Sequence, residues 1–337
     1  MTATDLPAKP YPTASSDASI NDPSACDSQL DDSFAAIDWQ APWLCHLNQL
    51  GYISKAITKL SGLKNELAQT DRIENTPDII AKVLNTALQQ QADDLQQPLP
   101  QTKPALNNQA QNLQFVSQDA LPAGEAYESF IGTTGNIPTR DNLHDLFNGS
   151  IWLTFPKTKA LLNYYHMLEI NQQGIGASRG RVRDTITVFD ENGAILVTAE
   201  PSIGEALVDF DWHASLVAPR DKWDKPKPSN NHSQAAVYIF GHALLEKLLQ
   251  PRKALCAHSI VINVTPDFFA LSLSERISHL DKRVADYMEV LLSQPDVTPR
   301  KLSPLPILGV PHYWAENANS SFYDDSQVFR SGRRRQK

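Results

Sequence analysis

The chain has 337 residues, of which 41% are hydrophobic, and a formal net charge of −8. This composition supports a buried core, and the acidic balance argues against binding of nucleic acid or anionic membranes over the whole surface. No run approaches the roughly 18 apolar residues that span a bilayer, and the first residues do not resemble a secretory signal. Three widely spaced cysteines without a CxxC pair indicate free thiols in a reducing compartment. We therefore expect a cytoplasmic protein without a membrane partner.

Shifts in composition along the chain predict five segments. The first segment is rich in Ser, Asp, Ala, Thr and Pro, and is too poor in large apolar side chains to fold. Apolar side chains at helical spacing from Ile79 to Leu88 predict a helix in the second. The third is rich in Gln, Pro and Asn. In chain order we expect a disordered tail (1–36), a helical N-terminal segment (37–97), a linker or long loop (98–112), a main domain (113–330) and a basic tail (331–337).

The main domain shows a mixture of helix and strand patterns. Thr139 is placed to cap a first helix, and Pro156 suits the first turn of a second. The β-branched run 184–189, the Asn-Gly turn before Ala194 and the apolar run after it predict a hairpin. Further elements are predicted as a strand (235–240), a helix (242–249), a strand (258–264) and a helix (273–292). The fold class expected is α+β, with helices packed on a small, mostly antiparallel sheet.

A polar stripe marks the first of these helices. Arg140, His144 and Asn148 fall four residues apart, and Asp145 lies beside them. An imidazole next to a carboxylate can act as a general base. We assign His144 as the base, Asp145 as its orienting partner or a metal ligand, Asn148 as a substrate or oxyanion donor, and Arg140 as a substrate-binding cation. The alternative is a capped surface helix with a solvated histidine.

A second polar pair follows the predicted strand 235–240. His242 and Glu246 lie four residues apart at the start of a helix, after a bend at Gly241. This spacing lets them share a proton or a metal, and we assign both to the catalytic site. The spacing lacks the second histidine of the HExxH zinc motif. A hydrogen bond on a surface helix is the alternative.

Further candidates lie outside these two helices. Arg183 could bind a carboxylate or phosphate of the substrate through its planar donor face. Tyr323 and Arg330 near the C-terminus are assigned to substrate binding. The adjacent carboxylates of Asp324 and Asp325 are candidate ligands of a divalent metal. An exposed charged loop is the alternative for this pair.

Several of these stretches resemble a family of bacterial proteins known as domain of unknown function 3025. The resemblance implies no activity. It implies that the polar segments recur together, which favours one shared pocket. The matching stretches run from Pro138 to Asn148, Phe155 to Asn163, Arg183 to Asp184, Phe189 to Gly193, Phe240 to Lys247, Pro304 to Pro311, Phe322 to Asp325 and Val328 to Arg330.

The leading hypothesis is an enzyme of the hydrolase or transferase type with a polar, metal-assisted pocket. The rival is a non-catalytic protein that binds a small anionic ligand or a protein partner. A third hypothesis is RNA binding through Lys157, Lys159, Arg179, Arg181 and Arg183, against the acidic total. The sequence does not distinguish the substrate, the metal or the oligomeric state.

Overall fold

The structure is a computed structural model. It describes residues 34, 37–47, 51–58, 78–104, 109–173, 180–225 and 233–332. Apart from Phe34, the tail predicted over 1–36 lies outside these residues, and so does most of the basic tail.

Helices dominate the described chain, and two small sheets accompany them, which confirms the α+β prediction. The helices are α3 (Ile79–Leu95), α4 (Tyr127–Thr134), α5 (Leu143–Thr154), α6 (Pro156–Gln173), α7 (Arg181–Asn192), α8 (Pro201–Val208), α9 (His242–Lys247) and α10 (Leu273–Leu292). The strands are β1 (Gln114–Ser117), β2 (Asn136–Thr139), β3 (Gly193–Thr198), β4 (Ala235–Ile239), β5 (Cys256–Asn263) and β6 (Ser303–Pro306).

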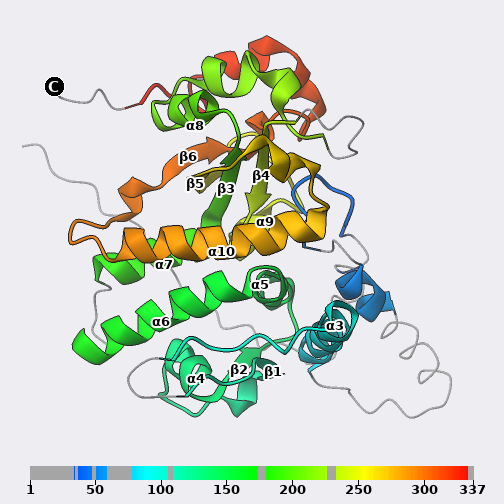
Figure 1. Cartoon of the computed structure of the whole chain (residues 1–337), viewed down its shortest axis with the longest axis vertical. Coiled ribbons are helices and arrows are strands. Elements are labelled where there is room, and N and C mark those ends of the chain that lie inside the picture. The colour runs from blue at the N-terminus through cyan, green and yellow to red at the C-terminus, as the bar shows by residue number, and fades with distance from the viewer. Residues whose placement is uncertain are drawn as a thin grey trace, which may run out of the picture.

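The larger sheet has the strand order β4-β3-β5-β6. Strand β3 pairs antiparallel with β4 and parallel with β5, and β5 pairs antiparallel with β6. Every residue of β3 and β4 is buried, as expected for strands that are covered on both faces. Figure 1 shows α8 and the C-terminal turns above this sheet, with α10 and α7 beneath it. The next layer holds α6 and α5, and the parallel β1–β2 pair lies with α4 at the bottom.

The predicted hairpin is wrong, because its first strand is helix α7. The apolar residues Val182, Ile186 and Phe189 recur at spacings of four and three, which fits one helical face better than a strand. Ile186 and Phe189 are fully buried on that face. The Asn-Gly pair therefore ends a helix and starts β3, instead of joining two strands.

Two helices are capped by carboxylates that are distant in sequence. Asp281 of α10 accepts hydrogen bonds from the backbone N–H groups of Lys157 and Thr158, at 2.9 Å each, in the first turn of α6. Asp141 accepts from the backbone N–H groups of Asp78 and Ile80 at the start of α3. Free N–H groups at a helix start need such acceptors. These bonds fix α6 on α10 and α3 on α5.

The cap of α5 differs from the prediction. Asn142, not Thr139, precedes the helix, and its side-chain oxygen accepts from the backbone N–H of Asp145 at 2.8 Å. Thr139 is the last residue of β2. The predicted polar stripe therefore begins one turn too early, because Arg140 lies outside the helix.

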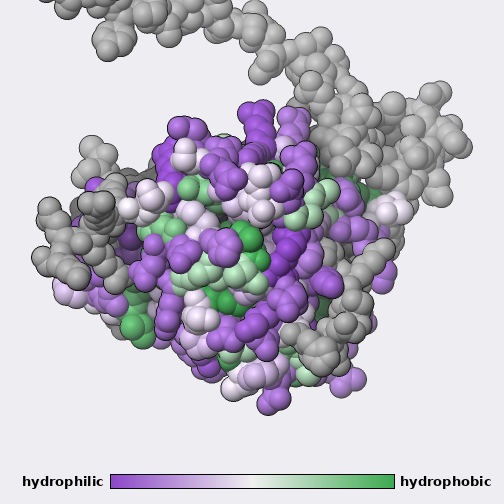
Figure 2. Space-filling model, turned by 90° about the horizontal axis from the view of Figure 1, so that it is seen from above, coloured by the Kyte–Doolittle hydropathy of each residue, from purple (hydrophilic) through white to green (hydrophobic). Residues whose placement is uncertain are grey.

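The surface is mostly hydrophilic on the face seen from above in Figure 2, with small separate hydrophobic areas. No helix among the described residues is long and apolar enough to cross a membrane.

Candidate functional site

A close backbone approach brings α9 against the end of α7. The N–H groups of Phe240 and Gly241 both donate to the carbonyl of Gly193, at 3.0 and 2.8 Å. A Cβ on Gly241 would lie 2.4 Å from the backbone nitrogen of Gly193, so only glycine fits there. His242, the first residue of α9, is thereby held beside Asp190 in the last turn of α7.

Four side chains from α5, α7 and α9 form a continuous series of contacts, which we call the relay: Glu246, His144, His242 and Asp190. Glu246 Oε2 lies 3.1 Å from Nδ1 of His144, and the Nε2 atoms of the two histidines lie 3.1 Å apart. Nδ1 of His242 lies 3.6 Å from Oδ2 of Asp190. The exposed fraction of the side chain falls from 38% at His144 to 8% at His242. The relay therefore leads from the surface into the protein.

The relay is one proton short when both imidazoles are neutral. Its three contacts each need one N–H hydrogen, but two neutral histidines supply only two. The hydrogen on Nδ1 of His144 is donated to Glu246, and the hydrogen on Nε2 of His242 is donated to Nε2 of His144. Nδ1 of His242 then stays bare, in keeping with its lack of a hydrogen bond. A third proton would give every contact a donor.

The electrostatics keep His242 neutral and Asp190 charged. Burial lowers the pKa of His242 to about 4, against the opposing charge of Asp190. Burial alone would raise the pKa of Asp190, but the charge of Lys159 and the hydrogen bond from its Nζ hold this pKa below its ordinary value. His242 is therefore an acceptor at neutral pH, next to a carboxylate that stabilises its protonated form.

The inner end of the relay opens onto a polar seam between α6 and α7, formed by Lys159, His166, Arg183 and Asp190. Lys159 Nζ lies 2.6 Å from Oδ1 of Asp190. His166 follows Lys159 by two helical turns, and Arg183 precedes Asp190 by two turns, so each pair shares one helix face. Burial lowers the pKa of His166, against the opposing charge of Glu128, whose Oε1 lies 4.0 Å from Nδ1 of His166, and smaller effects come from Asp190, Arg183 and Lys159. The two helices thus place one cation–acid pair at one end of the seam and a histidine with an arginine at the other.

Unpaired buried polar atoms gather around the relay and the seam. Among the described residues, five buried side-chain polar atoms have no hydrogen-bond partner, and four of them belong to this region. Trp152 is one of the four, and its ring lies 5.3 Å from Lys159 Nζ. Buried polar groups in native proteins are normally paired, and two of these four, Nδ1 of His166 and Nδ1 of His242, lie 4.0 and 3.6 Å from carboxylate oxygens of Glu128 and Asp190. The four atoms are Nε1 of Trp152, Nδ1 of His166, Nε of Arg183 and Nδ1 of His242.

A cavity of about 620 Å³ adjoins the outer end of the relay. Glu246 and Leu143, the residue before His144, both line it. Two cationic residues, Lys247 and Arg252, also belong to the wall. A molecule in this cavity would lie next to the Glu246–His144 end of the relay and near two positive charges.

The structure gives Asp145 and Asn148 other contacts than those predicted. Asp145 accepts from Nε and Nη2 of Arg140 at 3.1 and 2.9 Å, and Glu246 is the carboxylate that contacts His144. Arg140 is thus tied to the start of α5. Asn148 accepts from Lys159 Nζ at 2.9 Å and donates to the Tyr127 hydroxyl at 3.2 Å, which joins it to the inner end of the seam.

The four C-terminal candidates lie in a different part of the molecule, in the red turns at the top of Figure 1, whereas α5 lies at its centre. The Tyr323 hydroxyl donates to the carbonyl of Gly309, and Arg330 Nε donates to the carbonyl of Gln327. Asp325 pairs with Lys253 at 3.1 Å, and Asp324 is exposed. The contacts of Tyr323, Arg330 and Asp325 fasten this segment to its surroundings.

Sequence reasoning missed Asp190 and Lys159 as members of the site. Asp190 falls in the turn of the hairpin that the sequence predicts, where an aspartate is explained by the turn alone, so the wrong hairpin hid it. Lys159 was considered only as a contact to RNA, but its side chain is 6% exposed. A signal was present in α6, since Lys159, Asn163 and His166 recur at spacings of four and three inside an otherwise apolar stretch.

Metal binding gains no support from the geometry. Within the described part of the chain, no three His, Cys, Asp or Glu side chains are grouped so that they could hold a metal ion.

Comparison with known proteins identifies a family and no individual relative. Neither the curated proteins nor the solved structures contain a significant match to this chain. The family model described as protein of unknown function (DUF3025) matches residues 113–333, about two thirds of the chain. That match includes α5, α7 and α9, and hence every residue of the relay. The chain therefore belongs to the DUF3025 family.

Proposed function

We propose that this protein is an enzyme of the hydrolase or transferase type that works by general acid–base catalysis. The observation that carries the proposal is the Nε2–Nε2 contact of His144 and His242, with a carboxylate at each end. His144 takes a proton from the attacking nucleophile through the carboxylate of Glu246, because both of its ring nitrogens already lie in contacts with Glu246 and His242. His242 accepts charge from His144, and Asp190 stabilises that charge.

The substrate we propose is a small molecule with an anionic group. Lys247 and Arg252 supply positive charge in the cavity beside Glu246. An arginine offers paired donors that suit a carboxylate or a phosphate. A cytoplasmic location belongs to the same proposal, supported by the free thiols of Cys45 and Cys256.

A substrate screen tests the proposal directly. Purified protein is assayed with p-nitrophenyl phosphate and p-nitrophenyl esters, and the best substrate is carried into variants. His144→Ala should lower kcat/KM by about 10²–10⁴-fold, as expected for the loss of a general base. His213→Ala is the matched control, because His213 is an exposed histidine outside the relay. Retention of more than about a tenth of the activity in His144→Ala would refute the assignment.

A second test needs no substrate. The two imidazoles of the relay are titrated by nitrogen-15 NMR in the wild type and in Glu246→Gln. Loss of the Glu246 charge changes one end of the relay, so the low pKa of His242 should differ between the two proteins. An identical pKa of His242 in both proteins contradicts the relay.

The alternative function is non-catalytic binding of an anion. The unpaired nitrogens of Trp152 and Arg183 favour it, because both are donors that could meet an anionic oxygen. Calorimetry with inorganic phosphate and with acetate distinguishes the two functions. Binding that survives His144→Ala, without turnover of any substrate by the wild type, would favour the binding protein over the enzyme.

A further inference from the structure

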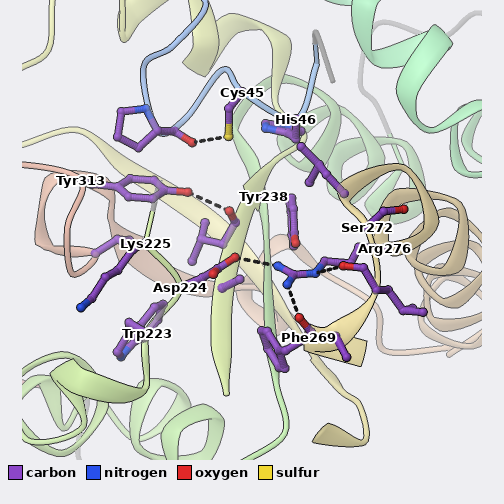
Figure 3. Close-up of a pocket in the computed structure, with 17 residues that line it drawn as sticks. Cys45, His46, Trp223, Asp224, Lys225, Tyr238, Phe269, Ser272, Arg276 and Tyr313 are labelled. Carbon is purple, nitrogen blue, oxygen red and sulfur yellow. Dashed lines mark hydrogen bonds and ion pairs between the residues drawn. The ribbon is translucent and has the colours of Figure 1, made fainter. Parts of the chain in front are cut away.

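A second cavity, of about 250 Å³, lies at the free edge of β4 and shares no residue with the relay. Figure 3 shows Tyr238 of β4, Arg276 of α10 and Asp224 together at one side of it, with Tyr313 and Cys45 across from them. Trp223 and Phe269 add two more aromatic rings to the lining. The cavity thus combines aromatic and aliphatic walls with one polar group of side chains.

The backbone carbonyl groups on the edge of β4 beside this cavity already accept hydrogen bonds. The carbonyl of Ala235 accepts from the backbone N–H of Asp224, that of Val237 from the Tyr313 hydroxyl and that of Ile239 from His46 Nε2, each at 2.7 Å. A strand added by a partner would need these acceptors. The cavity is therefore suited to a small molecule and not to a peptide in strand conformation.

Arg276 is held in place by three acceptors. Its Nη1 donates to Asp224 at 2.7 Å, its Nε donates to the carbonyl of Leu271 at 3.1 Å, and its Nη2 donates to the carbonyl of Phe269. The guanidinium also lies 5.4 Å from the ring centre of Phe269. Arg276 and Asp224 neutralise each other, and the side chain of Lys225, which also lines the cavity, points away from them in Figure 3, so the polar side carries little net charge.

Tyr238 is the group whose hydroxyl hydrogen lacks an acceptor among the described residues. The residue is 4% exposed, and its hydroxyl makes no hydrogen bond of normal geometry with any described residue, although it adjoins Arg276. Burial raises its pKa well above the ordinary value, against the lowering effect of Arg276, so the phenol keeps its proton. Buried hydroxyls normally find a partner. A neutral donor is thus directed at the polar side of the cavity.

We propose that this cavity binds a small, flat, neutral molecule: an aromatic ring that carries a carbonyl oxygen. The ring would lie against the apolar walls, and the oxygen would accept the hydrogen of Tyr238. The size fits, since a cavity of about 150 Å³ already admits benzene and this one leaves room for a substituent. A neutral head group fits better than a carboxylate, because Asp224 lies on the same side of the cavity and a charge would lose its hydration there.

Three probes of equal size and different charge test the proposal on the full-length protein. Benzamide, benzoate and benzylamine are titrated by chemical-shift perturbation, where fragments of this size bind with a Kd on the order of 1 mM. Benzamide should bind at least about threefold more tightly than either charged probe. Equal or tighter binding of benzoate, or no binding of benzamide, overturns the proposal.

Tyr238→Phe separates the hydroxyl from the ring. The variant should bind benzamide about 3–10-fold more weakly, the effect of one hydrogen bond, and should melt at the same temperature as the wild type or higher, because an unpaired hydroxyl is removed. Tyr287→Phe, at a half-exposed tyrosine of α10, is the control and should change neither quantity. Unchanged benzamide affinity in Tyr238→Phe, or a marked loss of stability, would show that the hydroxyl serves the fold and not a ligand.

Discussion

Replacing Lys159 by methionine tests whether the relay ends in a buried charge pair. The Lys159 side chain is 6% exposed, and its Nζ lies 2.6 Å from Oδ1 of Asp190 and 2.9 Å from Oδ1 of Asn148. Methionine has a similar length and no charge. The substitution therefore leaves the packing against Trp152 largely intact and leaves the carboxylate of Asp190 without its cation.

The expected loss of stability is about 3 kcal/mol. Removing one partner of a buried ion pair costs about 3–5 kcal/mol, because the remaining charge stays buried without compensation. The Asp190 side chain is 23% exposed, so water relieves part of this cost and the lower end applies. In the double variant Lys159→Met with Asp190→Leu no charge remains, and most of the lost stability should return.

Urea denaturation near pH 7 and near pH 4 provides the assay. In the wild type Lys159 holds the pKa of Asp190 below its ordinary value, so the stabilising effect of the charged form persists until the pH falls through that low pKa. In the variant burial acts unopposed and raises this pKa, so Asp190 takes up a proton earlier as the pH falls. The deficit of the variant should therefore shrink between pH 7 and pH 4. A loss below about 1 kcal/mol at pH 7, or an equal loss at both values, would refute the reasoning.

Three further predictions concern the fold around the two cavities and the relay. Burial lowers the pKa of His46 to about 4, so the contribution of the neutral ring to stability should be complete above about pH 6.5. The free energy of unfolding should then fall by about 3 kcal/mol toward pH 4. His46→Gln, which can still donate a hydrogen bond to the carbonyl of Ile239, should remove this part of the pH dependence in denaturation curves. Gly241→Ala should cost more than about 3 kcal/mol by chemical denaturation, because its Cβ meets backbone at 2.4 Å, whereas Gly124→Ala meets open space and should cost about 1 kcal/mol. His144→Ala should lower the free energy of unfolding by about 1 kcal/mol or less, and Phe147→Ala by about 3–5 kcal/mol, because His144 is half-buried and Phe147 is fully buried. Equal losses in the two variants would make His144 a structural residue.

The sequence predicted the members of the relay better than their pairing. The spacing of His242 and Glu246 placed both on α9, and the polar stripe placed His144 on α5. The partner of His144 could not be found from spacing along α5, because Glu246 comes from a helix about a hundred residues later. Asp145 was chosen as the neighbour in sequence, and its carboxylate instead holds Arg140.

The error over α7 had the largest consequence for the site. A β-branched run before Asn-Gly favours a hairpin on local propensity, but burial of Ile186 and Phe189 against the core decides for a helix. Tertiary packing commonly overrides local preference in this way. As a helix, α7 turns Asp190 inward to His242 and Lys159. As a strand end, the same residue would have had no role beyond the turn.

The energetic cost of the seam is the strongest argument that it serves a function. An unpaired buried polar group costs about 1–3 kcal/mol, and the whole stability of a domain is about 5–15 kcal/mol. Two of the four nitrogens, Nε1 of Trp152 and Nε of Arg183, have neither a hydrogen bond nor an ion-pair contact in the described part of the chain, so they oppose folding by about 2–6 kcal/mol. Replacing buried charged groups by apolar side chains of similar volume often leaves stability unchanged or raises it. Helices α6 and α7 also carry well-packed apolar residues such as Leu162 and Phe189, so their departure from local packing rules is confined to the faces that line the seam. Such confined departures are expected where a protein binds or transforms a ligand.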